Sequence, residues 1–132
     1  SMLGDVIELS IVVRDIEAAI KHFEKLFDLK VYKRGESEEF GFINAILPLG
    51  KGHIELLQPT NPSSAVARFL EARGEGVYLV GFECEDKPAS ARKLRDKGAR
   101  VTEGRLDNPL AWVHPKDAHG VFVELRETEQ YL

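Results

Sequence analysis

The chain is poor in cysteine and has no long apolar segment. Cys84 is the only cysteine in 132 residues, so no internal disulfide can form, and we expect a reducing compartment, the cytoplasm. No apolar run approaches the length of a membrane-spanning helix. The net charge of −4 lacks the basic excess that favours nucleic-acid binding. We therefore expect a single domain over residues 1–132, without a membrane or nucleic-acid partner.

What the chain does contain is an internal repeat. Residues 8–23 read ELSIVVRDIEAAIKHF and residues 79–94 read LVGFECEDKPASARKL. Each runs from a strand-like segment through an acidic residue into a helical segment. HIEL at 53–56 likewise matches FVEL at 122–125. A repeat of this content predicts one β-α-β-β-β unit that was duplicated and paired with itself.

The apolar periodicity predicts the elements of each module. Strands are expected at 6–13, 29–33, 40–47 and 51–58, then at 77–84, 100–103, 110–114 and 121–126, with helices at 16–27 and 89–97. Asp15 is a suitable N-cap for the first helix. The predicted fold class is α+β: two tandem βαβββ modules, approximately 6–58 and 77–126, joined by a linker helix at 62–73, form a curved mixed sheet around a cleft.

Strand parity predicts which side chains line this cleft, because alternate residues point to opposite faces of a sheet. With the apolar set of each strand against its helix, the inward positions on the first and last strands of the modules are Glu8, Ser10, His53, Glu55, Leu79, Gly81, Phe122, Glu124 and Arg126. Three carboxylates that face one cavity destabilise a fold unless they are paired, protonated or bound to a cation. The carboxylates therefore predict a site.

Several candidate residues also have a purely structural explanation. Glu8 lies near the start of the chain and is compatible with a solvated charge at a sheet edge. Glu124 has Arg126, two positions away, as an ion-pair partner. His53 is compatible with a histidine at the end of a turn, and Trp112 with a core position in the strand LAWV. The sequence leaves these alternatives open.

A family resemblance is carried by three segments, VVRDIEAAIKHFEKLFDLKV, HIELLQP and HPKDAHGVFVEL. They resemble the vicinal oxygen chelate superfamily, which includes glyoxalase I, methylmalonyl-CoA epimerase, extradiol dioxygenases and bleomycin resistance proteins. The resemblance extends over roughly residues 6–127. The linker and opening strand of the second module, SSAVARFLEARGEGVYLVGFECED, are similar to those of the epimerase branch.

The resemblance implies a divalent metal ion in the cleft, held by the first and last strands of each module. Carried over by position, its ligands fall on Glu8, Glu55 and Glu124. The second histidine of the epimerase pattern falls on Leu79, which cannot coordinate a metal. The implied ion is magnesium, manganese or cobalt at a site degenerate at Leu79, and oxygen-only ligands favour the first two. His53 is a substitute ligand only in a different geometry.

The implied activity is that of an isomerase (epimerase) or a lyase acting through metal-stabilised enolate chemistry. Such an enzyme removes a proton beside a thioester carbonyl and returns it on the other face. Glu39, in the segment SEEFGF, is expected to transfer the proton together with Glu124, and Glu38 is the neighbouring candidate. The family also implies a homodimer.

The alternative function is that of a metal-free small-molecule-binding protein of the same fold, either related to bleomycin resistance proteins or a sensor. In that case the ligand packs against Leu79, Trp112 and Phe122, and the carboxylates pair with a cationic group. The metal content of the purified protein separates the two functions.

Overall fold

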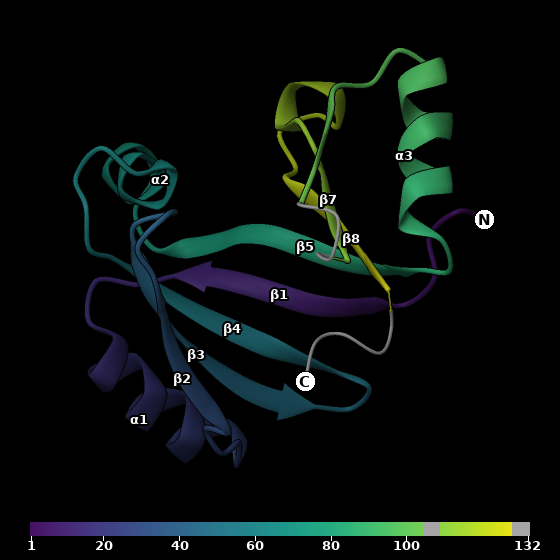
Figure 1. Cartoon of the computed structure of the whole chain (residues 1–132). Helices are drawn as coiled ribbons and strands as arrows, with labels where there is room; N and C mark the ends of the chain where they lie inside the picture. The colour runs from purple at the N-terminus through teal and green to yellow at the C-terminus, as the bar shows by residue number, and fades with distance from the viewer. Residues whose placement is uncertain (105–108, 128–132) are drawn as a thin grey trace. The chain divides into compact units, whose positions relative to one another are not determined.

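The computed structural model describes residues 1–104 and 109–127. The elements follow in the order β1 (Val6–Val12), α1 (Ile16–Phe27), β2 (Lys33–Ser37), β3 (Phe42–Leu49), β4 (Gly52–Pro59), α2 (Ala65–Arg73), β5 (Gly76–Cys84), α3 (Lys87–Asp96), β6 (Val101–Glu103), β7 (Leu110–Val113), a 3-10 turn η1 (Pro115–Asp117) and β8 (Val123–Glu127) (Figure 1). This order contains βαβββ twice, with α2 between the repeats. The predicted α+β class is confirmed.

The chain divides into two compact units. We call residues 9–78 the N-terminal unit, and residues 1–8 together with 79–132 the C-terminal unit. β1 and β5 each contribute residues to both units. None of the helices in the described part of the chain is long and apolar enough to cross a membrane.

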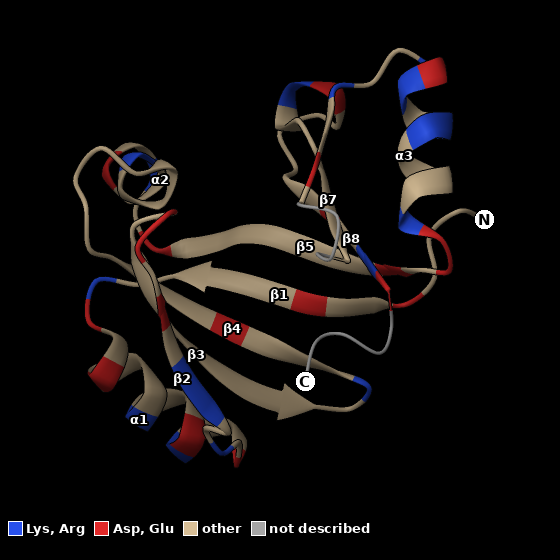
Figure 2. Cartoon of the chain, viewed as in Figure 1, with Lys and Arg blue, Asp and Glu red and all other residues tan. Residues whose placement is uncertain are grey.

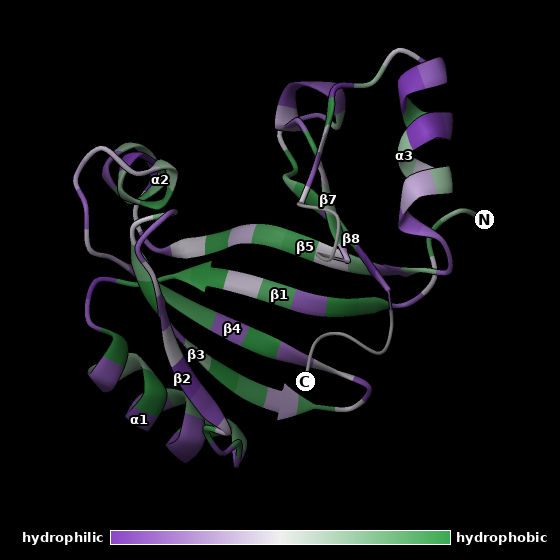
Figure 3. Cartoon of the chain, in the orientation of Figure 1, coloured by the Kyte–Doolittle hydropathy of each residue, from purple (hydrophilic) through white to green (hydrophobic). Residues whose placement is uncertain are grey.

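The β2–β3 and β3–β4 pairs of the N-terminal unit are antiparallel, and its sheet packs against α1. β2 pairs with β3 and β3 pairs with β4, and β1 follows beside β4. Figure 3 shows that β1, β3 and β4 are mainly apolar. α1 begins where the Asp15 side chain accepts a hydrogen bond from the Ala18 N–H at 3.1 Å, as an N-cap does. The core of the unit consists of Val13, Ile16, Ile20, Ala45, Leu47 and Leu56.

The C-terminal unit has a mixed sheet that packs against α3. β5 and β8 are parallel, whereas β8, β7 and β6 are joined by antiparallel pairs. The core consists of Cys84, Ala111 and Leu125, with Leu94 of α3 packed against it. α3 begins at an Asp86 cap, whose side chain accepts from the Ala89 N–H at 3.0 Å. The parallel pairing brings Gly81 of β5 opposite Glu124 of β8.

Two predicted strands differ from the structure. A strand was expected at 29–33, but β2 runs over Lys33–Ser37. Leu29 and Val31 are partly buried and pack against the core after α1. The Tyr32 N–H donates to the Ile46 carbonyl of β3 at 2.8 Å, but the regular pairing of β2 with β3 begins only at Lys33. In the last strand, Val121 was expected to be buried but is 43% exposed, because β8 begins only at Val123.

Candidate functional site

A buried cluster of charged residues lies within the C-terminal unit. Glu8 in β1 is 4% exposed, Glu124 in β8 is 5% exposed, and Arg126 in β8 is 8% exposed. Arg126 Nη1 donates to Glu8 Oε1 at 2.5 Å, and it lies 3.4 Å from Glu124 Oε2. One guanidinium is therefore shared by two buried carboxylates, and Glu8 is not a solvated edge charge. We call these three residues the ionic cluster.

Glu124 has a further partner across the β7–β8 ladder. Trp112 stands opposite Glu124 in that ladder, and its indole N–H donates to Glu124 Oε1 at 3.0 Å. Burial raises the pKa of Glu124 and the charge of Glu8 raises it further, whereas Arg126 and Trp112 lower it. The net shift is upward, so Glu124 holds its proton to a higher pH than an exposed glutamate does. The Trp112 side chain thus positions the Glu124 carboxylate in addition to its packing role.

Gly81 of β5 lies directly beside the ionic cluster. A Cβ atom at this position would lie 2.8 Å from Glu8 Cβ and 3.3 Å from Glu124 Oε2. Gly81→Ala is therefore expected to lower the free energy of unfolding by about 1–3 kcal/mol through overpacking, measured by urea denaturation. Gly76→Ala, on the same strand, is the matched control because nothing lies within 4 Å of its Cβ position. Equal losses in the two variants would contradict the close approach.

Glu55 of β4 is held by two hydrogen bonds within the N-terminal unit. Ser10 Oγ donates to Glu55 Oε1 at 2.9 Å, and Asn44 Nδ2 donates to Glu55 Oε2 at 2.7 Å. Figure 2 shows the acidic bands of β1 and β4 in strands that are otherwise uncharged. Both carboxylate oxygens of Glu55 therefore have a fixed direction, which orients the group for binding or proton transfer.

His53, Leu79 and Phe122 are the other residues that the sequence placed in the cleft. His53 is 3% exposed near the start of β4, on the same strand face as Glu55. Leu79 is 6% exposed in β5. Phe122 precedes β8, and its carbonyl accepts from the Val80 N–H at 3.0 Å. Their role in ligand binding stays a prediction.

Glu39 lies in the turn between β2 and β3, where it is exposed. The turn spans residues 38–41 and closes through the Gly41 N–H, which donates to the Ser37 carbonyl at 2.9 Å. Gly41 has a φ of 70°, which a residue with a Cβ rarely adopts. The turn therefore has a defined geometry and presents the Glu39 carboxylate from a fixed backbone.

The ligand chemistry of the described residues does not fit the implied metal ion. Within residues 1–104 and 109–127, no three or more His, Cys, Asp or Glu side chains gather closely enough to hold one. Leu79 offers no donor atom. In the C-terminal unit, the cation beside Glu8 and Glu124 is the guanidinium of Arg126. Metal ligation by Glu8, Glu55 and Glu124 together remains a sequence-based expectation.

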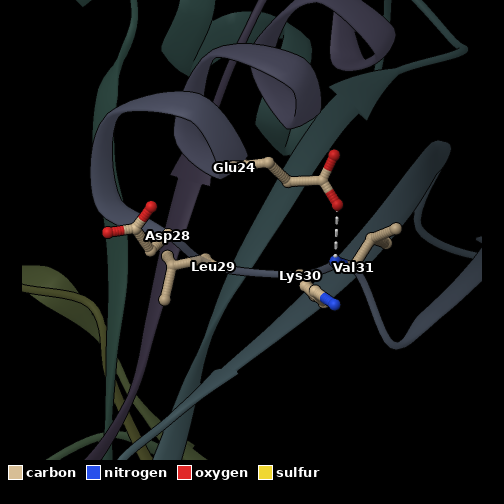
Figure 4. Close-up of a pocket in the computed structure, with 5 residues that line it drawn as sticks. All are labelled: Glu24, Asp28, Leu29, Lys30 and Val31. Atoms are coloured by element: carbon tan, nitrogen blue, oxygen red, sulfur yellow. Dashed lines mark hydrogen bonds between the residues drawn. The ribbon is translucent and has the colours of Figure 1, made fainter.

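A surface pocket lies at the end of α1. It has a volume of about 480 Å³ and is lined by Glu24, Asp28, Leu29, Lys30 and Val31. Figure 4 shows Glu24 turned toward the backbone of Val31, whose N–H donates to Glu24 Oε2 at 3.0 Å. The carboxylate of Glu24 thus closes the connection after α1, which is a structural role.

Two residues of these arrangements were missed or incompletely predicted from the sequence. Asn44 was not singled out, although it lies on the same face of its strand as Ile46, which stands opposite Glu55. Its polarity within the apolar segment FINAIL was the available signal. Arg126 was expected as a partner of Glu124, but its shorter contact is with Glu8, 118 positions away in the sequence.

Comparison with known proteins identifies the family. A family model described as Glyoxalase/Bleomycin resistance protein/Dioxygenase superfamily matches residues 8–112. The chain belongs to this superfamily. One curated relative is the ethylmalonyl-CoA/methylmalonyl-CoA epimerase of Cereibacter sphaeroides. Its sequence is 31% identical to this one, and the match covers 96% of this chain and 99% of the relative.

Solved structures of epimerases share the fold. The methylmalonyl-CoA epimerase of Mycobacterium tuberculosis superposes with a TM-score of 0.87 at 29% identity, over 96% of this chain and 89% of that one. A variant of the Streptomyces coelicolor methylmalonyl-CoA epimerase, in complex with 2-nitronate-propionyl-CoA, gives a TM-score of 0.88 at 30% identity, over 97% and 96% of the two chains. The predicted glyoxalase-like fold and the resemblance to epimerases are confirmed.

Proposed function

We propose that this superfamily member is an epimerase of 2-carboxyacyl-CoA thioesters such as methylmalonyl-CoA or ethylmalonyl-CoA. The observation that carries the proposal is the full-length similarity to an ethylmalonyl-CoA/methylmalonyl-CoA epimerase, since 99% of that relative is matched. A protein of the same fold binds 2-nitronate-propionyl-CoA. A nitronate is a planar anion with its charge on oxygen, as an enolate is, so this ligand is consistent with α-proton removal.

The residues of this chain supply the proton-transfer groups of the proposal. Glu39 takes the proton from the carbon beside the thioester carbonyl, and a second carboxyl group returns a proton to the opposite face. Glu124 is the second group expected from the sequence, and its raised pKa keeps a proton available to donate. Glu55, oriented by Ser10 and Asn44, is a further group that can bind a polar part of the substrate.

The metal ion and the metal-free alternative are not part of this proposal. The donor set of the C-terminal unit does not fit a divalent ion, so no step is assigned to one. The binding-protein alternative is not favoured, because the relatives with a stated activity are epimerases. The homodimer stays a prediction, which size-exclusion chromatography with light scattering would test.

The test is solvent exchange at the α-carbon. The purified full chain is mixed with single epimers of methylmalonyl-CoA and ethylmalonyl-CoA in D2O, and NMR follows both deuterium uptake at C2 and the appearance of the other epimer. We expect both processes above the spontaneous rate. The Glu39→Gln variant, purified identically, controls for a host epimerase. No acceleration with either thioester would reject the proposal.

A further inference from the structure

The ionic cluster supplies its own cation. We propose that the guanidinium of Arg126 takes the place that a divalent metal ion would occupy between Glu8 and Glu124, and that the C-terminal unit therefore binds no such ion. This inference does not depend on the proposed activity, because it concerns only which cation neutralises the cluster.

The position of Arg126 supports this substitution directly. A divalent ion bound to a carboxylate lies about 2.0–2.6 Å from the oxygen. Arg126 Nη1 lies 2.5 Å from Glu8 Oε1 and 3.4 Å from Glu124 Oε2. The first distance falls in this range and the second exceeds it, so the nitrogen lies against the Glu8 oxygen that a shared ion would have to bind.

The chemistry of arginine makes the substitution permanent. A guanidinium stays protonated at every pH at which proteins fold, so it cannot lose its charge to admit a second cation. The Arg126 side chain is only 10% exposed, and moving it aside would leave a buried charge without its partners. A divalent ion would also meet the like charge of Arg126 at short range.

The two halves of the internal repeat differ at two positions that bear on metal binding. Aligning HIEL at 53–56 with FVEL at 122–125 sets Glu55 against Glu124 and Leu57 against Arg126. Aligning the first strands of the modules sets Glu8 against Leu79. The second module therefore has an apolar residue where the first has a carboxylate, and a cation where the first has a leucine. Losing one carboxylate ligand and gaining one fixed cation both oppose metal binding.

The experiment measures bound metal in the purified full chain and in variants. Each protein is stripped with a chelator, dialysed against Mg²⁺, Mn²⁺ or Co²⁺, and assayed by elemental mass spectrometry and by thermal unfolding with and without the ion. We expect the wild type to hold far less than one ion per chain and to show no change in Tm. A tightly held ion in the wild type that Glu124→Gln removes would overturn the inference.

Two variants separate the roles of the missing donor and the resident cation. Leu79→His adds a donor but keeps Arg126, so we expect no ion. Leu79→His/Arg126→Met removes the cation as well, and we expect about one ion per chain with a Tm several degrees higher when the ion is present. A folded double variant that binds no more ion than the wild type would refute the substitution. If the double variant does not fold, Leu79→His alone tests the inference. A divalent ion bound by Leu79→His, with Arg126 still in place, would refute it.

Discussion

Replacing Glu39 with glutamine is expected to lower kcat for α-proton exchange by about 10²- to 10⁴-fold, the usual contribution of one positioned acid or base. Glutamine keeps the size and polarity of the side chain but cannot accept the proton. Because Glu39 is exposed in its turn, Tm and the far-UV circular dichroism spectrum should match those of the wild type. Deuterium uptake at C2 of methylmalonyl-CoA, fitted for kcat and KM separately, measures the loss.

Glu38→Gln is the matched control for this variant. It removes the same charge one position earlier in the same turn, so a general electrostatic effect of the turn would appear in both variants. We expect kcat of Glu38→Gln to stay close to that of the wild type. A large loss in Glu38→Gln with an active Glu39→Gln would assign proton transfer to Glu38 and contradict the role of Glu39.

Arg126→Met is expected to lower the free energy of unfolding by about 3–5 kcal/mol, the range found when one partner of a buried ion pair is removed. Methionine fills similar space, so the loss reports the unpaired charge of Glu8 more than a cavity. Urea denaturation followed by tryptophan fluorescence and circular dichroism measures the change. Trp112 contacts Glu124 directly, so its fluorescence reports on the cluster.

The exposed pair of Arg100 and Asp117 provides the control. Arg100 Nε donates to Asp117 Oδ2 at 2.9 Å, but the Arg100 side chain is 59% exposed. Arg100→Met should change stability little, because solvent screens such pairs.

Glu8→Gln/Arg126→Met should lose less stability than Arg126→Met alone, since it buries one charge fewer. Similar losses of stability in Arg100→Met and Arg126→Met would contradict the expected energetic contribution of the buried ionic cluster.

Strand faces could be predicted from the sequence because they follow from alternation within one segment. Ile54 and Leu56 pack into the core of the N-terminal unit, and Phe82, Val123 and Leu125 into that of the C-terminal unit, as parity predicted. Glu8 and Glu124, which parity assigned to one face, both contact Arg126. Alternation within single strands therefore identified the apolar core positions and the charged positions Glu8 and Glu124.

Pairing between distant strands could not be predicted in the same way. The expectation of a strand over 29–33 failed because Leu29 and Val31 are partly buried against the core ahead of the strand, while the polar segment Lys33–Ser37 pairs with β3. The contact of Arg126 with Glu8 depends on the order of strands in space, which alternation within β1 or β8 does not encode. For the same reason, parity placed Arg126 on the face of Glu124 but did not indicate its contact with Glu8.

The division of the chain has a consequence for the order of folding. The N-terminal unit is one continuous segment, residues 9–78, whereas the C-terminal unit joins residues 1–8 to a segment that begins at 79. Closing the contact between Glu8 and Arg126 brings together positions 118 residues apart, and contacts of such sequence separation form slowly. During synthesis, residues 9–78 can fold from their own contacts, whereas the contact between Glu8 and Arg126 forms only after the last strand has been made. The ionic cluster is therefore among the last parts of the protein to form.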